Sequence, residues 1–278
     1  MLSTLKLLAV TLLLSSALSA SSQNQKVEDF LEDSFSENPN IVSLDVEVVE
    51  RTPLEDLKGW EALIVSINAT IKGKPENRKV KQKMIWFTNG TIITKELTNM
   101  VSGENLADAV SPSFKDEFYK KENLIYGNTN AKHKVAIFSD PQCPFCRGYV
   151  PDAIKYMKKF PEKFAVYYYH FPLERLHPAA VQLSQAAVVA EQQGHKDAVL
   201  KLYEVEVNPK EKDVTKILKA FNDKFGTKIT PEDLKSAKVQ EHTKSDMDIA
   251  SEVMVQGTPT FFFDGKIDKT KKKFKKVQ

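Results

Sequence analysis

Apolar and polar residues alternate along the first third of the chain, a pattern typical of strands with one buried face. The clearest case is residues 63–71, where every second residue is apolar. Residues 80–87 form a further strand pattern, and the Asn89-Gly90 pair that follows predicts a hairpin closed by a type I′ turn. A short amphipathic helix precedes these strands. We therefore predict a small α+β domain over residues 21–108.

The pattern changes after this domain. Residues 109–124 are polar and mostly helix-permissive, and Pro112 interrupts them. We predict a linker helix here, with residues 116–122 as its clearest part.

A second domain is predicted over residues 125–278, with alternating strands and helices. Residues 134–139 form a short apolar run of the kind found in a central parallel strand. An amphipathic helix and a second apolar strand, residues 164–169, follow, which makes a strand-helix-strand unit with a right-handed crossover. A long helical stretch over about residues 178–253 then predicts a helical insertion, before a late strand that enters a hairpin.

The N-terminus has the pattern of a secretory signal peptide. Lys6 supplies positive charge, residues 7–14 are apolar, and residues 15–20 are small and mostly polar. The apolar run is too short to span a bilayer, although an uncleaved anchor stays an alternative. We predict a signal peptide over residues 1–20 and hence an exported protein.

Composition and charge agree with a folded protein. The chain is 41% hydrophobic and 28% charged, which excludes disorder throughout. The formal net charge is +3, yet residues 266–278 hold seven Lys against the single Asp268. Such a tail could bind acidic lipid or nucleic acid. Because no nucleic-acid motif accompanies it, we expect a solvated terminus and no nucleic-acid partner.

Only two cysteines are present, Cys143 and Cys146. A bridge between residues so close in sequence removes little entropy from the unfolded chain, so reactivity explains the pair better than stabilisation does. Two alternatives are an inert structural disulfide and a zinc site. A zinc site needs two more ligands, and the sequence has no second cysteine pair and no closely spaced histidine pair. We therefore expect no metal and no cofactor other than the Cys143–Cys146 redox pair.

The cysteines stand between a predicted strand and a predicted helix. With Cys143 as the N-cap, Pro144 takes the first helical position, where its missing N–H costs nothing. Unpaired N–H groups at the helix start then favour the Cys143 thiolate. Cys146 lies one turn further along the same face. We predict that Cys143 is the exposed attacking thiolate and that Cys146 is the buried resolving thiol, with Pro144 and Phe145 completing the motif.

Two motifs in the second domain resemble a known family. They are Phe138-Ser139-Asp140-Pro141-Gln142-Cys143-Pro144-Phe145-Cys146 and Gly257-Thr258-Pro259-Thr260-Phe261. Together they resemble the thioredoxin-fold Dsb proteins of the bacterial periplasm, most closely the dimeric DsbC/DsbG type. The resemblance is specific from about residue 124 onwards and weaker before residue 109.

The resemblance implies a thioredoxin-like domain, preceded by a small cystatin-like dimerisation domain and the linker helix. It implies that the Thr258-Pro259 bond is cis and that Gly257, Thr258 and Pro259 form a substrate-binding loop beside the cysteines. In this family the loop pairs with an extended substrate peptide. It also implies a periplasmic homodimer shaped like a V, with both Cys143 sulfurs facing a cleft.

Three positions near the cysteines, Ile137, Asp140 and Phe145, can be compared with related thioredoxin-fold enzymes. Ile137 stands where many thioredoxin-fold enzymes have a buried carboxylate, a gap shared by the DsbC/DsbG type. Asp140 resembles the Asp that this type places three positions before the first cysteine, which makes it a candidate auxiliary group, although a turn residue is the simpler interpretation. Phe145 stands where the monomeric oxidase DsbA has a His. A His there would stabilise the thiolate further, so we expect a weaker oxidant.

His170 and His177 flank a stretch that resembles the second strand and helix entry of the wider DsbA-like families. Thiol exchange requires no histidine, so we interpret both as structural or exposed residues.

The resemblance implies a thiol:disulfide oxidoreductase that forms or isomerises disulfides in exported proteins, and we favour an isomerase or reductase. Its expected partners are unfolded or misfolded exported proteins and a membrane redox protein of the Dsb type. Two alternatives stay open. One is a DsbA-like dithiol oxidase on a dimeric scaffold, and the other is a non-enzymatic periplasmic chaperone in which the cysteines are incidental.

Overall fold

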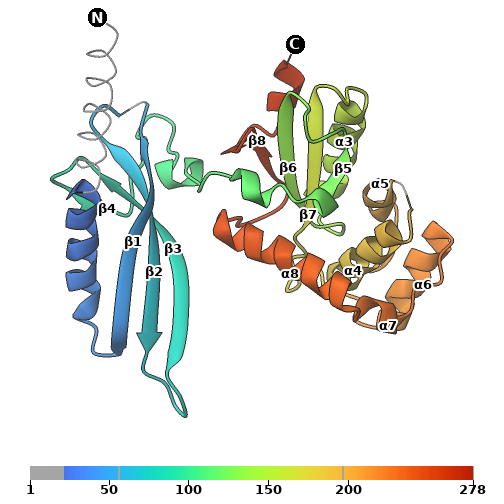
Figure 1. Cartoon of the computed structure of the whole chain (residues 1–278), viewed down its shortest axis with the longest axis horizontal. Helices are drawn as coiled ribbons and strands as arrows, with labels where there is room; N and C mark the ends of the chain where they lie inside the picture. Colours follow the sequence, from blue (N-terminus) through green and yellow to red (C-terminus); the bar gives the residue numbers. More distant parts are fainter. Residues whose placement is uncertain (1–21, 56, 196, 278) are drawn as a thin grey trace, which may run out of the picture. The chain divides into compact units, whose positions relative to one another are not determined.

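The computed structural model describes residues 22–55, 57–195 and 197–277 (Figure 1). The predicted signal peptide, residues 1–20, lies outside these ranges. The chain forms two compact units that divide between Val110 and Ser111. Across the described part of the chain, no helix combines the length and apolar character needed to cross a bilayer.

The first unit is a helix over residues 22–36 and a four-stranded antiparallel sheet. The strands, in sheet order, are β1 (Ile41–Pro53), β2 (Glu61–Ile71), β3 (Arg78–Thr88) and β4 (Ile93–Thr94). Leu31 of the helix packs with Leu63, Val65 and Trp86 in one buried cluster. The predicted α+β architecture of this unit is thus present, and the alternating residues of β2 supply its core.

The hairpin predicted at Asn89-Gly90 is present, but its turn is longer than predicted. Thr88 pairs with Ile93, which leaves a four-residue loop. The Asn89 side chain accepts the N–H groups of Thr91 and Ile92 at 3.0 and 2.8 Å, and Gly90 has a φ of +87°. Because Asn89 bonds to the backbone of its own loop, the predicted two-residue type I′ turn is wrong.

The predicted linker helix over residues 109–124 is wrong as well. Three short 3₁₀ turns stand in this region: η1 (Leu106–Ala109), η2 (Asp116–Phe118) and η3 (Lys121–Asn123). Pro112 lacks an N–H donor and disfavours helical geometry in the residue before it. Phe114 then packs edge-on against Phe138 and Tyr169 of the second unit. Residues from Ser111 onwards therefore fold with the second unit.

The second unit is built on a five-stranded sheet in the order β5-β7-β6-β8-β9. The strands are β5 (Leu124–Tyr126), β6 (His133–Ser139), β7 (Phe164–His170), β8 (Thr260–Phe263) and β9 (Lys266–Ile267). β6 and β7 are parallel and in register, with Val135 opposite Val166, whereas β8 runs antiparallel to β6. The predicted central parallel pair is confirmed. Asp264 and Gly265, both with positive φ, form the late hairpin.

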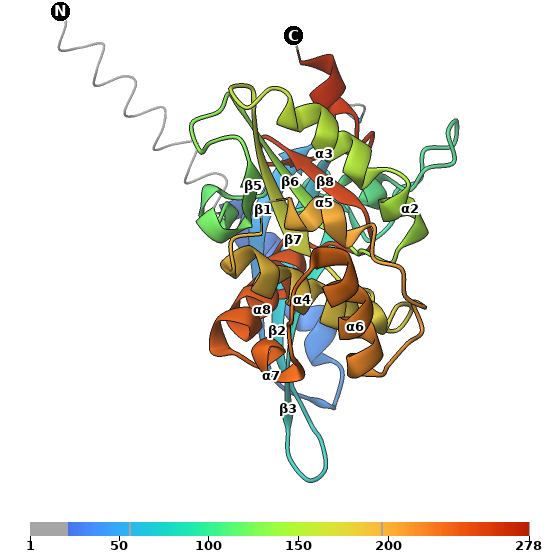
Figure 2. The same ribbon diagram turned by 90° about the vertical axis from the view of Figure 1, so that its right-hand side faces the viewer.

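Helices cover both faces of this sheet. The helices after β6 are α2 (Pro144–Arg147) and α3 (Val150–Lys158). α3 packs Ile154 and Met157 against the face that carries Ile137, which is the face turned toward the viewer in Figure 2. On the opposite face, Ile249 packs against Phe138 and its neighbours. The sheet is therefore the middle of three layers.

Among the residues described between β7 and β8, five helices are present, which matches the insertion predicted over residues 178–253. They are α4 (Ala179–Gln192), α5 (Ala198–Leu202), α6 (Val214–Phe225), α7 (Pro231–Leu234) and α8 (Ala237–Glu252). α6 begins at Asp213, whose side chain accepts the N–H of Thr215, and ends at Gly226, which has a φ of +71°. Leu183, Phe221 and neighbouring residues give the insertion a core of its own.

The Lys-rich C-terminus is not simply solvated. Phe274 lies in a short 3₁₀ turn, η4 (Lys273–Lys276), and only 1% of it is exposed. Its ring lies 5.5 Å from that of Tyr156 and 6.5 Å from that of Phe261. The expectation of a solvated terminus is wrong at this position because one aromatic residue anchors the tail in the core.

Candidate active site

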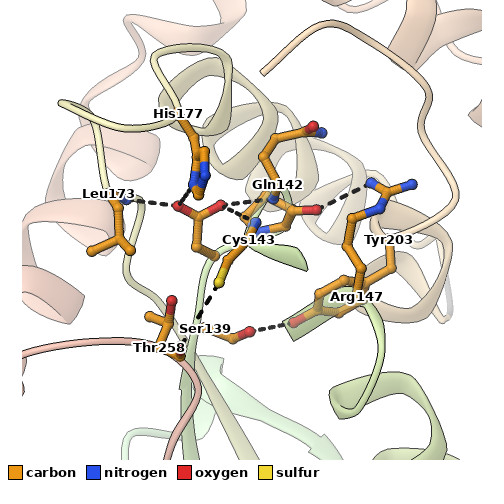
Figure 3. Close-up of polar contacts among 10 residues, drawn as sticks. Ser139, Gln142, Cys143, Arg147, Leu173, His177, Tyr203 and Thr258 are labelled. Carbon is orange, nitrogen blue, oxygen red and sulfur yellow. Dashed lines mark hydrogen bonds and ion pairs between the residues drawn. The ribbon is translucent and has the colours of Figure 1, made fainter. Parts of the chain in front are cut away.

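The two cysteines follow the carboxyl end of β6, as predicted. β8 pairs with β6, so Thr260 lies opposite Phe138 and the loop before β8 is brought to the same end of the sheet. The Thr258-Pro259 bond is cis, as the resemblance implied. The Cys143 thiol lies 3.8 Å from the Thr258 carbonyl oxygen (Figure 3). The two predicted motifs are therefore in contact.

Cys143 is the N-cap of α2, and Pro144 stands in its first turn. The Cys143 carbonyl accepts the Arg147 N–H at 2.9 Å, the first bond of the helix. This arrangement agrees with the local sequence, since Pro is well suited to the first helical position. α2 is only four residues long. The positive field at Cys143 therefore comes from the N–H groups of the first turn and not from a long helix.

The sulfur that was expected to be exposed is largely covered. Cys143 is 5% exposed and Cys146 is fully buried. The predicted order of accessibility is correct, but the Thr258 loop lies against Cys143 and restricts its contact with solvent. The exposed member of the motif is Phe145, at 78%.

Burial raises the pKa of the Cys146 thiol to about 11. Hydrogen bonds from Ser139, Thr258 and the backbone at Asp140 lower this pKa in part, and the nearby Cys143 charge raises it. Cys146 is therefore protonated at neutral pH, which suits a thiol that acts second.

A buried hydroxyl network lies beneath Cys146. The Tyr203 hydroxyl donates to Ser139 Oγ at 2.6 Å and lies 2.8 Å from the Tyr168 hydroxyl. Burial raises the pKa of both tyrosines. Ile137 is fully buried, as expected from its apolar side chain. The Ser139 hydroxyl is thus one polar partner of the resolving thiol, and the sequence analysis did not identify it.

Asp140 does more than close a turn. Its side chain is fully buried and accepts four hydrogen bonds. One carboxylate oxygen accepts the backbone N–H groups of Gln142 and Cys143, at 2.7 and 3.1 Å. The other accepts the Leu173 N–H at 2.8 Å and His177 Nδ1–H at 2.9 Å. Asp140 therefore holds the backbone of the attacking cysteine in place.

His177 was missed as part of the site. It precedes α4 and is half-buried beside Asp140 (Figure 3). Segments that follow two neighbouring parallel strands emerge at the same edge of a sheet. The parallel pairing of β6 and β7 was the signal that could have placed His177 near Asp140.

His170, by contrast, is structural, as predicted. Burial lowers its pKa to about 3, with a further contribution from His242. Its backbone N–H donates to Asp246 at 2.8 Å, and Asn123 donates to the other oxygen of the same carboxylate at 2.7 Å. This network joins β7 to α8.

Comparison with known proteins gives a family match. The family model described as thioredoxin matches residues 120–278, more than half of the chain. Among curated proteins, no sequence matches this one.

Several solved structures are similar to part of this chain. A thioredoxin-like oxidoreductase from Silicibacter pomeroyi DSS-3 is 22% identical, covers 54% of this chain and 84% of its own, and has a TM-score of 0.43. Oxidised BdbD from Bacillus subtilis is 18% identical over 60% of this chain and 92% of its own, with a TM-score of 0.46. Proteus mirabilis ScsC in a compact conformation is 19% identical over 58% and 76%, with a TM-score of 0.46.

Proposed function

The chain belongs to the thioredoxin family through residues 120–278, and on that basis we propose that it is a thiol:disulfide oxidoreductase acting on exported proteins. The predicted thioredoxin-like fold with a helical insertion is confirmed. The proposal rests on the difference in position and burial between the two sulfurs. Cys143 is the N-cap of α2 and is 5% exposed, whereas Cys146 is fully buried and protonated at neutral pH.

The chemistry would proceed by two exchanges. The Cys143 thiolate attacks one sulfur of a client disulfide, that disulfide breaks, and the second client sulfur leaves as a thiolate. Cys146 then loses its proton and attacks the Cys143 sulfur of the mixed disulfide. The bound client sulfur leaves as a thiolate and takes up a proton, and the pair is left as a disulfide. Two electrons have passed to the client, and the reverse sequence oxidises it.

The loop at Thr258 would position the client. Pro259 has no N–H, so Thr258 and Gly257 supply the backbone groups for pairing with an extended segment. The Thr258 carbonyl lies 3.8 Å from the Cys143 sulfur, which would place a paired client strand against the reacting atom. An unfolded chain meets this requirement, because its backbone is free to pair.

Phe145 supports isomerisation or reduction over oxidation. A stable Cys143 thiolate makes the pair more oxidising, and a His beside it would stabilise that thiolate by its charge. Phe145 is exposed and uncharged. We therefore favour an isomerase or reductase of the DsbC/DsbG type in the periplasm, kept reduced by a membrane redox partner. Alkylation of the thiols in intact cells tests this choice, since an oxidase would be found mostly disulfide-bonded.

The first unit would serve as the dimerisation domain, with a second copy as its partner. β1 is an edge strand, and Val42 and Val49 on it are 51% and 43% exposed. Exposed apolar residues on an edge strand favour pairing with another chain. Light scattering of the secreted form should give twice the mass of one chain, and a monomer would contradict the dimer.

Insulin reduction and repair of scrambled ribonuclease test the function itself. The redox proposal predicts that Cys143→Ser abolishes both. If the wild type catalyses neither reaction and Cys143→Ser refolds a client without cysteines as well as the wild type does, the alternative of a chaperone with incidental cysteines is correct.

A further inference from the structure

A groove runs beside Cys143, on the side of α2 that faces residues 205–209. Its volume is about 760 Å³. The lining includes Gln142, Pro144, Arg147, Val205, Val207 and Pro209. Gln142 and Pro144 are the two sequence neighbours of Cys143, so the groove is lined by residues on both sides of the attacking cysteine.

The groove is held by hydrogen bonds within the protein. Arg147 Nη1 donates to the carbonyl oxygens of Pro141 and Val205, each at 3.2 Å. The Pro209 carbonyl accepts the N–H of Ala179 at the start of α4. These bonds fix the 205–209 segment against the cysteine loop, so the groove exists without a bound partner.

The groove walls are largely apolar. Val205 is fully buried, Val207 is half-buried, and Pro144 is exposed. The space between them is larger than one aliphatic side chain. Covering such a side chain would remove apolar surface from water on both partners, which favours binding.

One polar group of the lining lacks a partner. Gln142 is 4% exposed, and its side-chain nitrogen makes no hydrogen bond with the residues that the structure describes. Its backbone N–H is already taken by Asp140. A buried amide donor without an acceptor carries a free-energy penalty, which a carbonyl oxygen from a bound chain would relieve.

Thr258 lies across the sulfur from this amide. Its hydroxyl is buried, and its hydrogen bond lowers the pKa of the Cys146 thiol. In Figure 3, Thr258 lies on one side of the Cys143 sulfur, and Gln142 and Arg147 lie on the other. An extended chain that pairs with the Thr258 loop and crosses Cys143 would continue toward the groove.

We propose that this groove is a specificity subsite for the client. It would take an apolar side chain next to the client cysteine, while the Gln142 amide donates to a client carbonyl. The inference rests on the proposed function, because it needs a client joined to Cys143. The substrate class is then an unfolded segment with an aliphatic residue near its cysteine.

The test uses the full secreted chain in its reduced form. Short peptides carry one cysteine as a mixed disulfide with glutathione, and a single Leu is moved through positions within about three residues of it in a Ser and Asn background. Stopped-flow fluorescence gives the second-order rate of reaction of each peptide. Glutathione disulfide measures the reactivity of Cys143 without a peptide.

We expect one Leu position to react roughly tenfold faster than its Ser counterpart. Equal rates for all peptides would overturn the subsite and leave the redox function standing. If neither the peptides nor glutathione disulfide reacts, the proposed function fails, and the inference fails with it. The three results are therefore distinguishable.

Two variants test whether a preference for Leu arises from the groove. Val207→Ser removes apolar lining, and Gln142→Met keeps the side-chain length but removes the donor. Val207→Ser should reduce the Leu preference several-fold. Gln142→Met should slow every peptide several-fold but leave the reaction with glutathione disulfide unchanged, and it tests the groove if Val207→Ser fails to fold. Met247→Ser, on the surface of α8, is the matched control and should keep the rates and the preference. If both groove variants keep the wild-type rates and preference, the assignment is overturned.

Discussion

His177 Nδ1 lies 2.9 Å from a carboxylate oxygen of Asp140, and this contact joins the two loops that follow the parallel strands β6 and β7. The same carboxylate accepts the backbone N–H of Cys143. The position of the attacking cysteine thus depends on a residue from a separate segment of the chain. Both side chains are shielded from solvent, so the contact is stronger than an exposed ion pair would be.

Asp140→Asn should destabilise the protein by about 2 kcal/mol. An amide can still accept the N–H groups of Gln142 and Cys143 through its oxygen. Its NH₂ group would then face the backbone N–H of Leu173, and that donor would lose its acceptor. Urea unfolding measures the loss, and the exposed Asp33→Asn is the control. A variant as stable as the wild type would show that the four hydrogen bonds carry no net stabilisation.

Burial of His170 should lower the free energy of unfolding of the protein in acid. Its pKa is lowered from 6.5 to about 3, so the unfolded chain takes up a proton over this interval and the folded chain does not. Its contribution to the free energy of unfolding is complete above pH 6.5 and falls as the pH drops toward 3. The decrease is on the order of a few kcal/mol.

The measurement is the free energy of unfolding against pH for the wild type and for His170→Asn. Burial raises the pKa of Asp246, and this contribution has the opposite sign, but it is common to both proteins. The wild type should lose stability more steeply than the variant as the pH falls from 6.5. Parallel curves would contradict the buried neutral state of His170.

Phe145→His should make the pair more oxidising. A cationic ring beside Cys143 would stabilise its thiolate and hence the reduced form. Because position 145 is 78% exposed, solvent screens the effect, and we expect the equilibrium constant with glutathione to shift by about tenfold or less. Phe145→Leu is the uncharged control. A shift toward a more reducing pair in Phe145→His would refute this interpretation of the motif.

Local sequence signals predicted the centre of the site well. An apolar strand followed by a cysteine and Pro144 was enough to predict the N-cap, because each signal acts within a few residues. The linker helix failed since packing of Phe114 against Phe138 and Tyr169 outweighed the helix preference of polar residues around it. Propensity alone carries no information about such tertiary contacts.

Side-chain contacts between distant segments that have no motif were the part that the sequence analysis did not supply. Asp140 and His177 meet only because β6 and β7 are parallel neighbours. Gln142 and Val207 line one groove only because Arg147 bonds to the Val205 carbonyl. Neither relationship has a periodic pattern or a motif along the chain.

The central claim is that Cys143 attacks and that Cys146 releases the captured client. The most direct measurement is mass spectrometry of the covalent complex formed by a disulfide-containing client with Cys146→Ala and with Cys143→Ala. We predict that Cys146→Ala accumulates a mixed disulfide at Cys143 and that Cys143→Ala forms none. A complex formed through Cys146 in Cys143→Ala, or none with either variant, would contradict the account.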